Sequence, residues 1–179
     1  QTLIDSMTPV SGKGVWSDPD VDPIKELDEL IQNIVTATGM MPNRLAIGFA
    51  AWVVLRHHPK VLARQPGAAN IGVSLEQLKG MLAAPVEPRV GILSKDANKF
   101  GKAKSAQQIF GAKVLLFIGS ENPTVYDPSF AKTFSTKRGS VDAVYSYRET
   151  NCRSDILAVD WSEERQVVYQ EAAQLVSLT

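Results

Sequence analysis

The feature that most constrains this chain is an apolar stripe of helical period between residues 24 and 38. Asp22 offers a side-chain oxygen to the free amides of a helix start, and Pro23 suits the first helical position, where an N–H has no partner in any case. Gly39 follows at the position where a left-handed C-cap is typical. The residues of the stripe are Ile24, Leu27, Leu30, Ile31, Ile34, Val35 and Thr38. The stripe predicts an amphipathic helix whose apolar face must be covered by another layer.

The apolar runs after this helix are shorter and alternate between strand and helix patterns. Pro42 and Asn43 predict a turn, and residues 45–49 are typical of a buried strand. Residues 50–57 return to helical spacing, and Pro59 predicts a break in that helix.

A capping-box pattern marks a further short helix. Ser74 is followed three residues later by Gln77, just ahead of an apolar stretch, and Pro85 and Pro88 end the pattern. Residues 89–93 then predict a strand.

The second half of the chain is dominated by strand patterns. Residues 94–108 carry four lysines among small residues, which predicts an exposed loop that packs against nothing. Residues 114–118 are apolar on both faces and predict a central strand. From Phe134 onward, β-branched and aromatic residues predict strands centred on 141–147, 156–159, 166–169 and 175–178. The sum is an α+β protein with helices mainly in its first half, packed on mixed sheets.

The length of 179 residues suits one compact body. We expect an extended segment at 1–20, an α+β domain at 21–140 and a β-rich closing segment at 141–179. The chain begins at Gln1 without an initiator Met, so we expect a fragment of a longer protein.

Composition excludes several classes of protein. Hydrophobic residues make up 44% and charged residues 21%, which is typical of a folded globular chain. Lysine plus arginine equals aspartate plus glutamate at 19 each, so no overall field attracts nucleic acid or an anionic membrane. Cys152 is the one cysteine, which excludes an internal disulfide and a thiolate metal cluster. No apolar run is long enough to cross a bilayer, and no signal peptide is visible.

Motifs for catalysis are missing from the sequence. The glycine-rich patterns of nucleotide sites and the G-x-S-x-G pattern of serine hydrolases do not occur. His57 and His58 are adjacent, so on a helix they point about 100° apart and cannot act as an i, i+4 metal pair. The simpler interpretation is two residues near a helix C-terminus, where positive charge is favourable. We expect no enzyme, no cofactor and no metal.

Two groups of residues allow more than one interpretation. The lysines of 94–108 could bind an acidic surface or phosphate, or they could simply be solvated. Trp16, Trp52 and Trp161 are expected in the core or at a subunit interface.

Two series of residues occur in a characteristic order. The first series is Trp16, Asp22, Pro23, Gly39, Pro42, Asn43, Trp52, Leu55, His58 and Pro59. The second series is Phe110, Gly111, Pro128, Ser129, Phe134, Arg148 and Asp155. This order resembles the major capsid proteins of tailed bacteriophages over most of the chain.

The resemblance implies the major capsid fold, with an axial domain near five-fold and six-fold positions and a peripheral domain that joins neighbouring capsomers. It also implies that the family's N-terminal arm, extended hairpin and spine helix are missing, since they would precede Gln1. The loop that carries the lysines is then the candidate for the ring centre. Its residues are Lys95, Lys99, Phe100, Lys102 and Lys104.

The expected function is that of a structural subunit of a phage or prophage head shell, located in the virion capsid and assembled in the bacterial host cytoplasm. Such a subunit would form pentamers and hexamers that enclose DNA. Its partners would be copies of itself, scaffold and portal proteins, and packaged DNA only non-specifically, with no membrane. Two alternatives stay open: a bacterial nanocompartment shell protein, and a small-molecule-binding or hydrolytic α+β domain built from dispersed carboxylates and the lysine loop.

Overall fold

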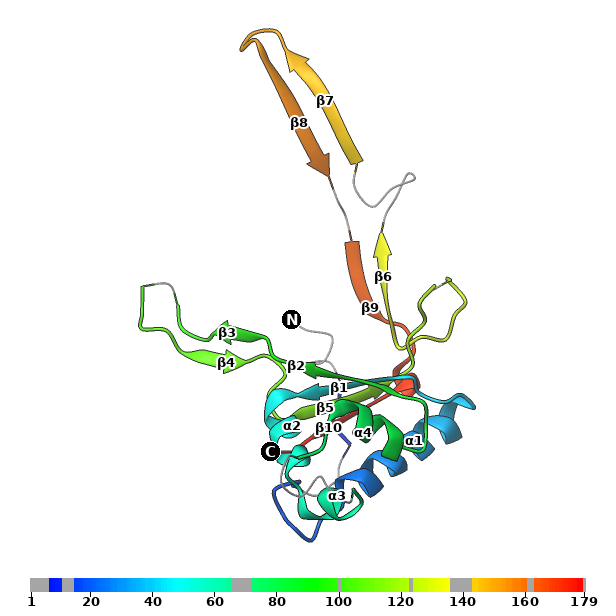
Figure 1. Cartoon of the computed structure of the whole chain (residues 1–179). Helices are drawn as coiled ribbons and strands as arrows, with labels where there is room; N and C mark the ends of the chain where they lie inside the picture. Colours follow the sequence, from blue (N-terminus) through cyan, green and yellow to red (C-terminus); the bar gives the residue numbers. More distant parts are fainter. Residues whose placement is uncertain are drawn as a thin grey trace.

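The computed structural model contains a four-stranded mixed sheet in the order β10-β5-β1-β2. The structure describes residues 7–10, 15–65, 72–99, 101–122, 124–135, 143–160 and 163–178. Strand β1 (Arg44–Gly48) pairs in parallel with β2 (Glu87–Gly91) and antiparallel with β5 (Lys113–Phe117). Strand β10 (Ala173–Ser177) completes the sheet against β5, directly after the short 3₁₀ helix η2 (Gln170–Ala172). Helices lie below this sheet and two ribbons project from it (Figure 1).

Helix α1 (Pro23–Thr38) forms as its sequence predicts. The Asp22 carboxylate accepts a hydrogen bond from the Lys25 amide at 3.3 Å, and Gly39 ends the helix with a φ of 72°. Ile24, Leu27, Leu30, Ile31 and Ile34 of the apolar stripe are buried, and Val35 and Thr38 are half-buried. Trp16 is also buried, and its indole N–H donates to the Glu26 carboxylate at 2.8 Å. The chain ahead of α1 is thereby fixed to the helix.

Three short helices share this side of the sheet. Helix α2 (Phe49–Arg56) follows β1 directly, and α3 (Pro59–Ala63) begins where Pro59 requires a restart. Helix α4 (Leu75–Met81) has the predicted capping box, in which Ser74 and Gln77 each bind the other's backbone amide. Within the described residues, no helix is both long enough and apolar enough to span a membrane.

His58 corrects one prediction. His57 caps the C-terminus of α2 as expected, but His58 is the N-cap of α3, at the start of a helix. Its Nδ1 accepts the Lys60 amide at 3.3 Å, and its Nε2 lies 3.1 Å from the Asp18 carbonyl. The imidazole therefore satisfies backbone groups, and it is almost completely buried.

The sheet has two different faces because side chains alternate along each strand. Leu45, Ile47, Val114 and Leu116 point to the helices and join the main core with α1 to α4. Leu115 belongs to a second, smaller cluster on the opposite face. The other buried members of that cluster are Phe130, Ala172, Ala173 and Leu175. The prediction of a central strand that is apolar on both faces is confirmed for β5.

The two edges of the sheet differ in hydrogen bonding and in composition. On the β10 edge, the Val10 amide donates to the Leu175 carbonyl at 2.8 Å, so the leading segment extends the hydrogen bonding. Strand β2 has no second neighbour among the described strands, and it carries Pro88 and Arg89. Proline and charge on an edge strand oppose pairing with another chain.

Residues 94–108 form a hairpin, which corrects the prediction of a loop. Strand β3 (Ser94–Asp96) pairs antiparallel with β4 (Ala106–Gln108), and every residue of both strands is exposed. The prediction that nothing packs there is correct for the strands, but the hairpin is held by the Asp96 side chain, which sequence periodicity does not reveal. We call residues 94–108 the β3–β4 arm. Phe100 lies outside the described residues.

A longer ribbon rises from the other end of the body (Figure 1). Strand β6 (Ala131–Ser135) pairs with β9 (Glu163–Val167), and farther out β7 (Ala143–Glu149) pairs with β8 (Ser154–Asp160). We call these four strands the long ribbon. The strands predicted in the last third of the chain are therefore present, although Val141 and Trp161 lie outside the described residues.

The arm and the sheet meet at a close backbone approach. A Cβ atom on Gly48 would lie 1.9 Å from the Gly111 carbonyl oxygen, so only glycine fits at position 48. Its φ of −66° is ordinary, which leaves space as the reason for the glycine.

We expect Gly48→Ala to lower the free energy of unfolding by about 3 kcal/mol or more, because a backbone carbonyl cannot move aside cheaply. Gly80→Ala is the matched control, since no atom lies within 4 Å of its added Cβ. In helix α4 that change should stabilise by about 0.5–1 kcal/mol. Urea unfolding measures both variants. Equal midpoints for the two would contradict the close approach.

Candidate functional site

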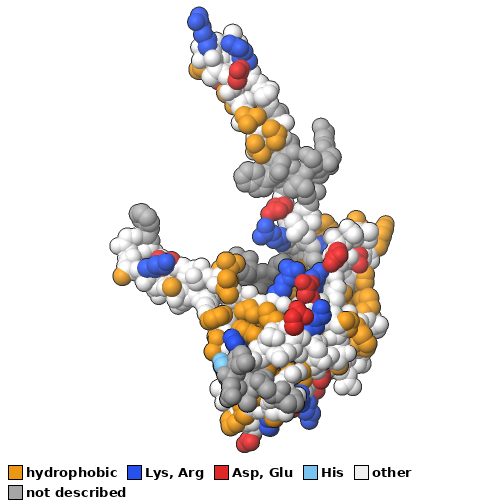
Figure 2. Space-filling view, viewed as in Figure 1, with side chains coloured by type: hydrophobic (Ala, Val, Ile, Leu, Met, Phe, Trp, Pro, Cys, Tyr) orange, Lys and Arg blue, Asp and Glu red, His pale blue; other side chains and the backbone are white. Residues whose placement is uncertain are grey.

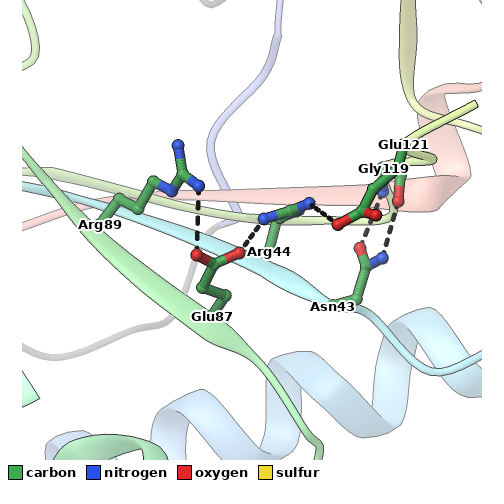
Figure 3. Close-up of polar contacts among 6 residues, drawn as sticks. All are labelled: Asn43, Arg44, Glu87, Arg89, Gly119 and Glu121. Carbon is green, nitrogen blue, oxygen red and sulfur yellow. Dashed lines mark hydrogen bonds and ion pairs between the residues drawn. The ribbon is translucent and has the colours of Figure 1, made fainter. Parts of the chain in front are cut away.

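A chain of ion pairs lies across the open face of the sheet, beside the root of the long ribbon (Figure 3). Arg44 and Glu87 are register partners on β1 and β2, and their side chains form a salt bridge. Arg44 also binds Glu121 at 3.2 Å, and Arg89 binds Glu87 at 3.1 Å. Each carboxylate and guanidinium of this chain already has a partner of opposite charge.

Asn43 ties the turn before β1 to the segment after β5. Its Nδ2 donates to the Gly119 carbonyl at 2.7 Å, and its Oδ1 accepts the Gly119 amide at 2.9 Å (Figure 3). This reciprocal pair copies the hydrogen bonding of a backbone strand. It fixes the position of the segment that carries Glu121.

Lys132 anchors the first strand of the long ribbon to the loop below it. The residue is 7% exposed, and its ammonium group donates to the carbonyls of Thr124 at 2.8 Å, Val125 at 3.2 Å and Asp127. Ser129 donates its hydroxyl to the Asp127 carboxylate in the same loop. A buried ammonium must be hydrogen-bonded on all its N–H groups, and three carbonyls meet that requirement.

These groups surround a cavity of about 480 Å³ between the sheet and the ribbon root. It is lined by Arg44, Leu45, Ala46, Glu87, Arg89, Phe117, Gly119, Ser120, Ser129, Ala131, Lys132 and Thr133. The size is within the usual range for a ligand pocket. Its ionic side chains are occupied by one another or by backbone carbonyls, so the arrangement is suited to joining strands. Within the described residues, no three His, Cys, Asp or Glu side chains could hold a metal ion.

Two ionisable groups near the ribbon and arm are perturbed by local contacts. The Ser105 amide, and then the Asn98 amide, lower the pKa of Asp96 below its usual value. Loss of hydration, followed by the hydrogen bond and charge of Glu171, raises the pKa of Tyr169. Both groups interact with neighbouring residues of their own segment rather than with the cavity.

A patch of exposed apolar side chains surrounds the root of the β3–β4 arm. Gly48 and Gly91 are register partners, so Phe49 and Ile92, the residues that follow them, leave the sheet at the same end. The Ile109 amide donates to the Leu93 carbonyl at 2.9 Å. The members of this arm-root patch, with their exposed fractions, are Phe49 43%, Val53 44%, Ile92 72%, Leu93 73% and Ile109 43%. Figure 2 shows hydrophobic side chains gathered where the arm joins the body.

The long ribbon also exposes apolar side chains, on both of its faces. Val144 is paired with Val159 on one face, and Tyr147 is paired with Ile156 on the other. Val144 is 61% exposed, and Leu157 is 69% exposed. A two-stranded ribbon without a core is marginally stable in water, so these side chains are suited to contact with another surface.

The residues that carried the family resemblance do not converge on one site. Most of them are helix caps, turn residues or core residues: Trp16, Asp22, Pro23, Gly39, Pro42, Leu55, His58 and Pro59. Trp52 is half-buried against the core on α2. Phe110 and Gly111 join the arm to β5, and Pro128 lies in the loop before β6. Phe134 is partly exposed on β6.

The structure does bring some of these residues into contact with one another or with the cavity. Arg148 and Asp155 face each other across the long ribbon, with a separation of 4.0 Å. Ser129 lines the cavity, and Asn43 holds its edge. Lys95, Lys99, Lys102 and Lys104 belong to the arm, and none of them lines the cavity.

Sequence reasoning missed the ion-pair chain and the buried lysine. Arg44 and Lys132 are single charges next to apolar strand residues, and Glu87 and Arg89 alternate within one strand. Isolated charges in such runs are the signal that could have identified them. Their partners lie far away in sequence, so pairing was not visible without the sheet register.

We expect Lys132→Met to lower the free energy of unfolding by about 1–3 kcal/mol, because three carbonyls lose their buried donor. Amide hydrogen exchange should also quicken at residues 124–127. Lys104→Met, an exposed lysine on the arm, is the control and should change stability by less than about 0.5 kcal/mol. Similar small effects from both variants would contradict the anchoring role.

Comparison with known proteins identifies relatives only among solved structures. No protein-family model and no curated protein matches the chain. The chain is similar to a phage-related protein from Bordetella bronchiseptica, with a TM-score of 0.72 and 26% identity over 90% of this chain and 51% of that one. A Mycobacterium phage Che8 structure matches with a TM-score of 0.49 and 14% identity, over 98% of this chain and 55% of that one. The chain thus spans about half the length of these structures, and its α+β fold is similar to that of a phage-related protein.

Proposed function

We propose that the chain is a structural subunit of a phage or prophage head shell, which self-assembles into pentamers and hexamers that enclose DNA. The similarity of its fold to a phage-related protein supports a phage setting. The resemblance of its residue order to tailed-phage major capsid proteins supports the shell. The virion capsid, assembly in the host cytoplasm and contacts with scaffold and portal proteins belong to the same proposal.

The observation that carries the proposal is the arm-root patch. Ile92 and Leu93 are more than 70% exposed, and they follow β2 at the end of the sheet where Phe49 follows β1. A contiguous apolar patch on a folded body is typical of a protein interface. Phe49 and Val53 are on α2, and the other members flank the strands at the root of the arm, so the patch combines helix and strand residues of the body.

The two ribbons support the same function. Each projects from the body (Figure 1), and every strand residue of the arm is exposed. A closed ring requires surfaces that reach beyond one subunit's own core, and projecting ribbons provide them. A nanocompartment shell would use the same contacts, and it differs in its cargo, which would be protein rather than DNA.

We expect the chain to form particles of five or six times 19.5 kDa at high concentration, measured by size-exclusion chromatography with light scattering. Ile92→Asp combined with Leu93→Asp should raise the concentration needed for assembly by roughly tenfold or more, because an interface disfavours unpaired carboxylates. Met41→Asp is the matched control, since Met41 is 59% exposed and lies outside the patch.

Two outcomes would contradict the proposal. A chain that stays monomeric at every concentration would exclude ring contacts within this part of the protein. Assembly that survives the double substitution unchanged would show that the arm-root patch is not the contact. Electron microscopy of the assembled fraction distinguishes rings from irregular aggregates.

A further inference from the structure

The β3–β4 arm extends from the body as a separate, exposed element (Figure 1). All six residues of its strands are exposed, and the described residues of its turn are exposed or half-exposed. No described residue of the arm contributes to either buried cluster. Its order must therefore come from its own hydrogen bonds.

The Asp96 side chain accepts the hydrogen bonds that order the arm. Its Oδ1 accepts the amides of Asn98 and Ser105, each at 3.0 Å, and the Ala97 amide donates to the Ser105 carbonyl at 2.9 Å. Lys102 closes the turn by donating its amide to the Lys99 carbonyl at 3.2 Å. The one carboxylate of the arm is thus engaged with backbone amides and does not neutralise a lysine.

The four lysines of the arm outnumber its one carboxylate. None of Lys95, Lys99, Lys102 and Lys104 forms a salt bridge with a described residue. With Asp96 included, residues 94–108 carry a formal charge of +3 in a chain whose net charge is +0. Positive charge is therefore concentrated on an element that projects from the body (Figure 1).

Protection of a strand edge does not explain this concentration. Lysine on an exposed strand prevents pairing with another chain, and Lys95 on β3 fits that role. Lys99, Lys102 and Lys104 lie in the turn, where no strand edge needs protection. Three charges on one ordered turn require another explanation.

We propose that the β3–β4 arm is a nucleic-acid contact that binds phosphate groups through Lys99, Lys102 and Lys104, with Lys95 alongside. The lysine ammonium is a compact point charge. Regularly spaced phosphate groups are the polyanion that suits the several lysines of the β3–β4 arm best. The lysines are point charges without a bidentate fork, so the contacts that they make are to phosphates and are independent of nucleotide sequence. The inference rests on the proposed function for its setting, since a head shell encloses DNA.

A membrane surface fits the arm less well. Peripheral membrane elements combine basic residues with apolar side chains that enter the bilayer. Residues 97–105 contain a single large apolar residue, Phe100, which is less apolar surface than such elements usually insert. The phosphates of a nucleic acid can be bound by the lysine charges alone.

Fluorescence anisotropy of a labelled, short single-stranded DNA of mixed sequence tests the inference on the full chain. Lys99→Gln combined with Lys102→Gln should weaken binding by roughly tenfold or more near 0.1 M salt, and the slope of log K against log salt should fall by about 0.7 for each lost contact. Lys79→Gln combined with Arg153→Gln removes the same charge elsewhere and should leave binding nearly unchanged. Asp96→Asn keeps an acceptor oxygen, removes one negative charge and should tighten binding.

The inference is overturned if the arm variant and the control variant bind DNA equally, or if vesicles containing phosphatidylglycerol bind the arm while DNA does not. Thermal unfolding of each variant verifies that the arm substitutions leave the body folded. Light scattering without DNA measures assembly separately. A chain that never assembles but binds DNA through the arm would refute the shell function alone, whereas arm-independent binding in an assembling chain would refute this inference alone.

Discussion

Burial of the α1 stripe against the helix-facing side of the sheet is the contact on which both ribbons depend. Ile24, Leu27 and Ile34 are almost completely covered, in one core with Leu116 and Val176. Each such side chain contributes about 1.5–3 kcal/mol when buried. The described parts of the arm and the long ribbon bury little themselves, so they hold their direction only because this core keeps the strands beneath them in place.

The sequence was informative wherever a few neighbouring residues determine a structure. Helix α1 could be predicted because its caps at Asp22 and Gly39 lie next to an unbroken stripe. The capping box of α4 needs only Ser74 and Gln77. The central position of β5 followed from its apolar residues on both faces. In each case the residues that favour the structure lie close together in the sequence.

The candidate site and the arm required information that no local pattern contains. Arg44 meets Glu87 because β1 and β2 pair in parallel, across 43 positions of sequence. Such contacts depend on strand register, and register is set by the packed body. The arm differs, because its hairpin is held locally by the Asp96 side chain, which accepts an amide nine residues away. Apolar periodicity contains no signal for such a contact.

Lys132 gives the root of the long ribbon an unusual chemical character. Its ammonium occupies a ring of carbonyl oxygens of the sort that elsewhere strips the hydration shell from a potassium ion. Here the cation is covalently attached to the strand that it holds. Dialysis, dilution or a chelator can remove a bound ion from such a ring of carbonyls, but none of them can remove the Lys132 ammonium.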